Sequence, residues 1–209
     1  MNPGLLLLAL FASPPAFAQV QPGLSHLLDQ IQAAQRQALR QSRVGVFSHV
    51  PAVTPDGRNA VQALLEAGLN VTAVFAAEHG FAANGVAGIP IHNGELDYKG
   101  RKIPLYSLYG QKGRKPTKEM LDRTDVIIVD FQDVGARFYT YAGSMLYMMQ
   151  AAAAQNKPVI VLDRPNPMGG EIVGGRISDR EGFKPSLTNP FPMPLVHGMT
   201  MGELASLFN

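Results

Sequence analysis

Apolar segments typical of buried β-strands alternate along this chain with segments typical of helices, and this alternation constrains the fold more than any other feature. The predicted buried strands are residues 43–48, 71–75, 126–131 and 159–163. Residues 59–67 and 139–155 are predicted helices between them. Strands that alternate with helices pair in parallel through right-handed crossovers. The sequence therefore predicts an α/β fold with a doubly wound, mainly parallel sheet and helices on both faces.

The remaining segments are predicted to be loops and short elements. Residues 76–102 are rich in glycine and poor in apolar runs, which predicts one long, functional loop. A short strand is expected at residues 103–106, at an edge of the sheet because Pro104 cannot donate a ladder hydrogen bond. Thr117 is expected to cap a short helix. Residues 200–203 form a capping-box pattern that opens a last helix.

The N-terminus has the pattern of a secretory signal peptide, residues 1–18. An apolar core at residues 5–11 is followed by a small-x-small cleavage site at residues 16–18. The segment lacks the usual Lys or Arg before its apolar core. We expect a secreted or periplasmic protein in which residues 19–42 form a helical leader and residues 43–209 form the main domain.

The composition narrows the possible partners. The chain has no cysteine, so an exported protein of this kind depends on packing and not on disulfides. Its 18 Lys and Arg against 16 Asp and Glu are spread without a run, which argues against a nucleic-acid partner. After the signal segment no apolar stretch is long enough to cross a bilayer, so we expect no integral membrane association.

Three predicted strands lead into carboxylates, namely Glu78, Asp130 and Asp163, and Asp133 follows shortly after the second of these. Because the carboxyl ends of parallel strands share one edge of the sheet, these acids are expected along one rim, where α/β proteins bind ligands. Clustered carboxylates repel one another and raise at least one pKa, as a general acid near neutral pH requires. Carboxylates that cap helix N-termini would give the same pattern at some of these positions.

Basic and aromatic residues accompany these acids. Arg137 and Arg164 each follow a strand-end acid, either as a structural ion pair or as a clamp on a substrate carboxylate. Tyr139 and Tyr141 offer flat rings with hydroxyl groups, which suit the face of a sugar but are also ordinary core residues.

Several other chemistries lack their sequence patterns, and we expect no metal or cofactor. The five histidines are scattered without a zinc-type pair. The first predicted strand is not followed by a glycine fingerprint for dinucleotides. No serine lies in a Gly-x-Ser-x-Gly elbow.

Several motifs together resemble one bacterial family, the exo-β-N-acetylmuramidases. They lie at residues 77–80, 106–110, 114–117, 130–141, 162–167 and 197–200. The resemblance runs from about Arg43 to Asn209, and the block at 130–141 is highly specific. Two departures are Ala77, where the family usually has Pro, and residues 48–50, where it usually has Thr-Asn-Pro.

The resemblance implies hydrolysis that releases terminal N-acetylmuramic acid from peptidoglycan fragments, so the expected partners are muramyl saccharides. It implies a Rossmann-like N-terminal domain and a smaller C-terminal domain with the site between them. Because the family continues past Asn209, we expect the smaller domain to be largely absent from this chain.

The resemblance also suggests roles for individual residues. Glu78 of the Glu-His-Gly motif is the leading catalytic candidate, assisted by Asp130, Asp133 or Asp163. The residues expected around the sugar are His79, Arg137, Tyr139, Tyr141, Asp163, Arg164 and Asn166. The lactyl carboxylate of muramic acid would give Arg137 or Arg164 a partner. The 2-acetamido oxygen of the substrate is a further possible nucleophile, so retention and inversion stay open.

Two other functions stay as alternatives. A non-catalytic module that binds cell-wall sugars would need the same rim and aromatic residues. A Rossmann-type oxidoreductase would share the fold, but the missing glycine fingerprint argues against it.

Overall fold

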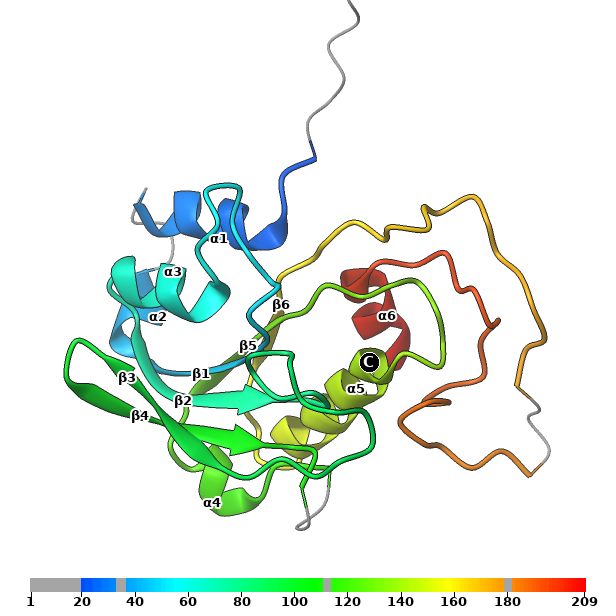
Figure 1. Cartoon of the computed structure of the whole chain (residues 1–209). Helices are drawn as coiled ribbons and strands as arrows, with labels where there is room; N and C mark the ends of the chain where they lie inside the picture. Colours follow the sequence, from blue (N-terminus) through cyan, green and yellow to red (C-terminus); the bar gives the residue numbers. More distant parts are fainter. Residues whose placement is uncertain (1–19, 33–36, 111–113, 179–181) are drawn as a thin grey trace, which may run out of the picture.

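A six-stranded sheet in the order β3-β4-β2-β1-β5-β6 forms the centre of the molecule in the computed structural model (Figure 1). The described residues are 20–32, 37–110, 114–178 and 182–209, so the predicted signal peptide lies outside them. The strands are β1 Arg43–Ser48, β2 Asn70–Ala76, β3 Gly94–Tyr98, β4 Arg101–Ser107, β5 Val126–Asp130 and β6 Val159–Val161. Neighbouring strands are parallel except β3, which runs antiparallel to β4. The predicted mainly parallel α/β sheet is confirmed.

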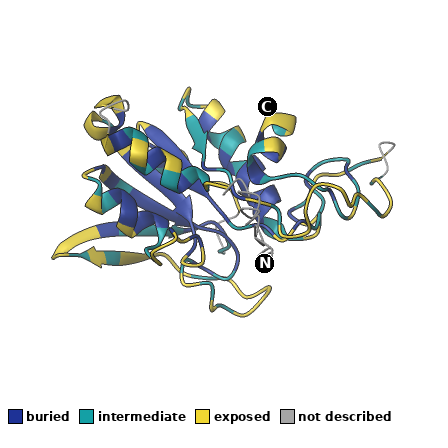
Figure 2. Cartoon of the chain, turned by 90° about the horizontal axis from the view of Figure 1, so that it is seen from above, coloured by how far each residue is buried: buried dark blue, intermediate teal, exposed yellow. Residues whose placement is uncertain are grey.

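Helices cover both faces of the sheet, as predicted, and each face has its own core (Figure 1). The first core contains residues of α1 Gly23–Gln32, α2 Gln37–Gln41 and α3 Ala60–Glu66. The second contains residues of α4 Lys118–Leu121, α5 Thr140–Ala153 and α6 Met201–Phe208. Side chains alternate between the cores along β5, since Val126 and Ile128 face the first and Ile127 and Val129 the second. Figure 2 shows the central strands buried between these layers.

Three helices begin at polar caps, and the sequence predicted two of them, at Thr117 and Thr200. The Asn59 side chain accepts a hydrogen bond from the Gln62 amide at the start of α3. Thr117 caps α4 in the same way. At α6 the full capping box forms between Thr200 and Glu203.

The strand β3 and the position of β4 differ from the prediction. The expected loop at residues 76–102 contains β3, which pairs with β4 through a two-residue turn at Lys99 and Gly100. Both turn residues have positive φ, of 52° and 81°, as a type I′ hairpin requires. The expectation that β4 is an edge strand was wrong, because β3 covers its outer side. Pro104 is tolerated since pairing with β2 begins only at Leu105.

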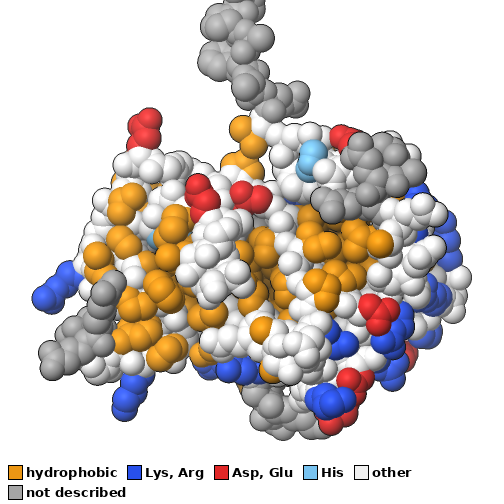
Figure 3. Space-filling model, turned by 180° about the vertical axis from the view of Figure 1, so that it is seen from behind, with side chains coloured by type: hydrophobic (Ala, Val, Ile, Leu, Met, Phe, Trp, Pro, Cys, Tyr) orange, Lys and Arg blue, Asp and Glu red, His pale blue; other side chains and the backbone are white. Residues whose placement is uncertain are grey.

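The edge at β6 also differs from the prediction of a buried strand over residues 159–163. β6 ends at Val161, and its three residues are only partly buried because no strand pairs with its outer side among the described residues. Figure 3 shows the face behind that of Figure 1, where apolar side chains gather across the middle and most charged groups lie near the periphery.

A long arm, residues 165–200, leaves the sheet after β6 and returns to α6 (Figure 1). It contains no helix or strand among its described residues, only isolated bridges such as Gly174 to Val196 and Ala136 to Val196. Several of its apolar side chains are exposed, namely Met168, Ile172, Val173, Ile177 and Leu195. The bridge to Ala136 fastens the arm beside the loop that follows β5.

Candidate active site

The carboxyl ends of β2, β1, β5 and β6 lie along one edge of the sheet. The order of the strands reverses between β1 and β5, and in open α/β sheets the ligand crevice lies at such a switch point. The last residue of β1, Ser48, is in register with Asp130 at the end of β5, and its hydroxyl donates to the Asp130 carbonyl at 2.8 Å. The loops beyond these two strand ends therefore lie where open α/β sheets bind their ligands.

Glu78 follows β2 by two residues and is only 8 % exposed. Its Oε1 accepts a hydrogen bond of 2.9 Å from the backbone amide of Gly88. The side chains of Thr140 and Tyr109 also make polar contacts with the carboxylate. Burial by itself would raise the pKa of Glu78, but these donors outweigh it and hold the pKa below its usual value. Glu78 is therefore ionised at neutral pH in the free protein.

Asp130 and Arg164 form an ion pair at the centre of the rim. Nε of Arg164 donates to Oδ1 of Asp130 at 2.6 Å, and Nη2 donates to Oδ2 at 3.0 Å. Burial raises the pKa of Asp130, and the guanidinium opposes this effect. The structure therefore contains the ion pair that was one of the two alternatives for Arg164, and binding of a substrate carboxylate by Arg164 stays a prediction.

The strand-end acids do not act on one another in the way the sequence interpretation expected. Glu78 has donors from Gly88, Thr140 and Tyr109, Asp130 has Arg164, and no neighbouring carboxylate contributes to either pKa shift. Of the shifts resolved for these acids, the pKa of Asp130 is the raised one. Burial raises it, and not repulsion from another carboxylate.

Asp133 lies in the loop after β5 beside His197 from the arm. Oδ2 of Asp133 accepts a hydrogen bond of 2.7 Å from the Gly135 amide and lies 3.3 Å from Nε2 of His197. The second contact is an approach between the groups without the alignment of a hydrogen bond. Nδ1 of His197 accepts from the Met199 amide, so the proton of the neutral ring is on Nε2, facing Asp133. Oδ1 of Asp133 is buried without a partner among the described residues.

The rings of Tyr139 and Tyr141 lie near Glu78, and Tyr139 also lies near Asp133. Tyr139 and Tyr141 pack edge to face with centroids 4.6 Å apart, and Tyr141 also contacts Phe131 and His49. Burial raises the pKa of Tyr139, and the negative charges of Asp133 and Glu78 add to the effect. Tyr139 therefore lies within electrostatic reach of both acids.

His49, directly after β1, is buried and neutral in this setting. Burial, together with the positive charge of Arg164, lowers its pKa from 6.5 to about 4. Its Nε2 accepts from the Gln132 amide at 3.2 Å, which joins the loops after β1 and β5, while its buried Nδ1 has no partner among the described residues.

Three predicted sugar-binding residues fasten loops. Nη1 of Arg137 donates to the carbonyls of Arg176 and Met193 in the arm. The Asp163 carboxylate accepts from the Thr200 hydroxyl and the Gly202 amide at the start of α6.

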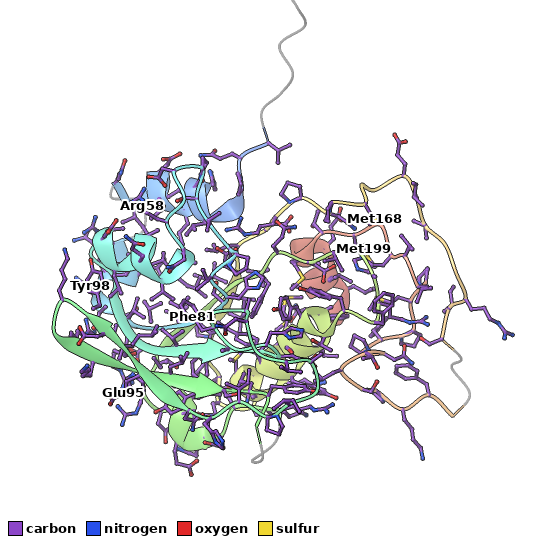
Figure 4. The ribbon with its side chains drawn as sticks, viewed as in Figure 1. Arg58, Phe81, Glu95, Tyr98, Met168 and Met199 are labelled. Atoms are coloured by element: carbon purple, nitrogen blue, oxygen red, sulfur yellow. The ribbon has the colours of Figure 1, made fainter. Side chains whose placement is uncertain are left out.

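Asn166 completes this set. Its side chain donates to the Met199 carbonyl and accepts from the Met168 amide, and Figure 4 shows Met168 and Met199 side by side above α6. These bonds give all three residues structural partners, and contact of any of them with a sugar stays a prediction.

Apart from Asp130 and Arg137, the predicted site residues thus fall into two groups. Glu78, His79, Asp133, Tyr139 and Tyr141 gather around the loops after β2 and β5. A pocket of about 620 Å³ lies on the β6 side of the rim, and its lining includes Asp163, Arg164, Asn166, His26, Gly170 and Glu203.

Several residues around Glu78 and Asp133 were not assigned a role from the sequence. They are His49, Gly88, Tyr109, Thr140 and His197. Tyr109, Thr140 and His197 belong to motifs that resemble the family, so the motifs were a usable signal for them. The backbone donor at Gly88 has no such signal, because its role depends on how the loop folds back.

Two other kinds of feature are absent from the described ranges. No group of three or more His, Cys, Asp or Glu there is arranged to hold a metal ion. None of the helices in the same ranges is long and apolar enough to cross a membrane.

Comparison with known proteins decides the family. Residues 44–209 match the model of the family described as exo-β-N-acetylmuramidase NamZ, N-terminal. The chain belongs to the NamZ exo-β-N-acetylmuramidase family. The chain is 42 % identical over 192 residues to the peptidoglycan β-N-acetylmuramidase NamZ of Bacillus subtilis strain 168, a match that covers 91 % of this chain and 44 % of that protein.

Two solved structures have a fold similar to that of this chain. Two DUF1343 family proteins of Bacteroides fragilis NCTC 9343, each 35 % identical, superpose with TM-scores of 0.77 and 0.70. They cover 90 % and 89 % of this chain, and 45 % of each of those chains is matched. The chain therefore spans less than half the length of these relatives.

Proposed function

We propose that this chain carries the catalytic carboxylate of an exported, exo-acting glycoside hydrolase that releases terminal N-acetylmuramic acid from peptidoglycan fragments. Membership of the NamZ family supports the substrate class. The observation that carries the assignment within this chain is Glu78, a buried carboxylate beyond a strand end, surrounded by hydrogen-bond donors and tyrosines.

Glu78 acts as the general acid/base in this proposal. Its lowered pKa gives the ionised form, which accepts a proton from water. Proton donation to the glycosidic oxygen requires a higher pKa. Because burial already opposes the donors at this carboxylate, a sugar that covers Glu78 would raise its pKa further and favour the protonated form.

A second group must stabilise the sugar carbon as the bond to the leaving group breaks. Asp133 is the acid candidate in this proposal, since Tyr139 lies within electrostatic reach of both it and Glu78. The 2-acetamido oxygen of the substrate is the other candidate. A hydrogen bond from the Tyr139 hydroxyl to the sugar would fit its position within reach of both acids.

The test is release of free N-acetylmuramic acid from a defined wall disaccharide by the full-length protein. We expect Glu78→Gln to lower turnover by at least about 100-fold, the scale of a lost general acid/base. Glu95→Gln on β3 is the matched control, because Glu95 is exposed on the hairpin (Figure 4). Wild-type turnover in Glu78→Gln would show that Glu78 is not catalytic, and binding of muramic acid without turnover in the wild type would select the sugar-binding module.

A further inference from the structure

His79, the residue after Glu78, has an unusual backbone conformation. Its φ is 68°, in the left-handed region that few residues other than glycine adopt. Gly80 follows with φ of 74°. Such a conformation is strained and persists only where surrounding contacts fix it. Among the described residues, the hydrogen bonds of His79 are made with one residue further along the same loop.

That residue is Gly85. Nδ1 of the His79 ring lies 2.9 Å from the Gly85 carbonyl oxygen, so Nδ1 carries the proton and donates. The Gly85 amide donates in return to the His79 carbonyl at 3.0 Å. The two residues approach so closely that a Cβ added at Gly85 would lie 2.9 Å from the His79 carbonyl oxygen. Both the side chain and the backbone of His79 therefore bind Gly85.

Between Gly85 and Gly88 the loop makes no hydrogen bond to the rest of the protein among the described residues, and the next one after Gly88 is from the Ile91 amide to the Tyr109 carbonyl. Val86 and Ile89 are 70 % and 57 % exposed, and residues 86–90 are all exposed. Earlier in the loop the Phe81 carbonyl accepts from the Val50 amide, and its ring packs on the first core (Figure 4). The pair of His79 and Gly85 is thus the last fixed point before the Gly88 amide donates to Glu78.

We propose that His79 is a positioning residue whose imidazole, by holding Gly85, keeps the loop in the form that places the Gly88 amide on the Glu78 carboxylate. The inference rests on the proposed function of Glu78. It differs from the sequence expectation that His79 binds the sugar, because Nδ1 is already engaged and only Nε2 would remain for a substrate.

Three variants distinguish the role of Nδ1 of His79 from that of Nε2. His79→Gly removes the ring and tolerates positive φ, so it removes the bond without adding backbone strain. His79→Asn places an amide donor near the position of Nδ1 and also tolerates positive φ. His79→Gln places its amide near the position of Nε2. The matched control is His92→Ala, since His92 is exposed near the end of the same loop.

The first readout is the full-length protein's kcat/KM as a function of pH. His79→Gly and His79→Gln should lose about tenfold to 100-fold, the scale of a displaced catalytic group, and His79→Asn should keep most of the activity. In His79→Gly and His79→Gln, the limb of the pH profile that reports Glu78 should move to higher pH. The reason is that loss of the Gly88 donor raises the pKa of this carboxyl. The titratable groups that also influence or respond to Glu78 are His79, Tyr109, Tyr139 and Tyr141.

The second readout is hydrogen exchange at the Gly88 amide, which does not depend on activity. Exchange should be faster in His79→Gly than in the wild type, and near wild type in His79→Asn and His92→Ala. Unchanged exchange and an unchanged pH limb in His79→Gly would overturn the proposal, as would full activity in His79→Gln together with its loss in His79→Asn. If the wild type releases no muramic acid, the proposed function fails, and the exchange result still decides whether His79 positions the loop.

Discussion

The guanidinium of Arg164 and the carboxylate of Asp130 are 6 % and 0 % exposed, and they pair through two hydrogen bonds at the centre of the rim. The third nitrogen, Nη1, donates to the Val53 carbonyl in the segment after β1. Asp130 ends β5 and Arg164 follows β6. One buried pair therefore joins the segments that leave three neighbouring strands, beside the candidate catalytic groups.

Arg164→Met should destabilise the protein by about 3–5 kcal/mol, because it leaves the Asp130 carboxylate buried without its partner. The free energy of unfolding in urea measures this loss. The double variant Asp130→Asn with Arg164→Met should lose less than the sum of the two single changes, since it removes both charges together.

Arg176→Met is the control for the Arg164 change, because the Arg176 side chain is exposed, and it should change the free energy of unfolding by less than about 0.5 kcal/mol. An Arg164→Met protein of unchanged stability but raised KM would contradict the structural role. It would favour the substrate clamp expected from the sequence.

Gly135→Ala should destabilise the loop after β5. Gly135 has φ of 84°, and an added Cβ would overlap the Asn166 side chain and lie 2.9 Å from Cγ of Met168. The left-handed conformation alone costs about 1–2 kcal/mol for a residue with a Cβ, and the overlap adds to this. Thermal unfolding measures the effect. Gly174→Ala in the arm is the control, because nothing lies within 4 Å of its added Cβ, and equal losses in both variants would contradict the argument.

The strands and helices that the sequence predicted well are those whose signal is local. β5 is a continuous apolar run buried on both faces, and the caps at Thr117 and Thr200 bond within their own first turns. The hairpin strand β3 was missed because it is mostly exposed and lacks an apolar pattern. The prediction that Pro104 lies on an edge strand was wrong because β3, which covers β4, was not recognised in the sequence.

The candidate site also has features that depend on local sequence and features that depend on the tertiary fold. The strand-end position of Glu78 follows from local pattern and parallel topology, and the sequence predicted it. The Gly88 amide, by contrast, reaches Glu78 only because the loop between them folds back on itself. The pairing of Arg164 with Asp130 depends on which loops meet at the switch point, a tertiary property that left two alternatives open.

The buried ring of His49 should make stability depend on pH. Its pKa is about 4 in the folded protein against 6.5 when unperturbed, so between these values the unfolded chain binds a proton that the folded protein does not. The free energy of unfolding should therefore fall as pH is lowered from about 6.5 to about 4. His49→Phe keeps an aromatic ring beside Phe131 and Tyr141 and should show a smaller fall. Urea unfolding across this range checks it, with exposed His92→Ala as control, and an equal fall in all three proteins would contradict the role of His49.

Tyr109→Phe should shift the pH profile of the full-length enzyme upward. Tyr109 is one of the groups that lower the pKa of Glu78, so its loss should raise that pKa. If Glu78 must be ionised, kcat/KM falls as pH drops through this pKa, and if it must be protonated, kcat/KM falls as pH rises through it. In either role the limb that reports Glu78 moves to higher pH in Tyr109→Phe. Tyr106→Phe on β4, whose ring packs against Phe75, should leave both limbs in place. A limb that stays fixed in Tyr109→Phe but disappears in Glu78→Gln would mean that the Tyr109 contact does not affect the charge of the Glu78 carboxylate.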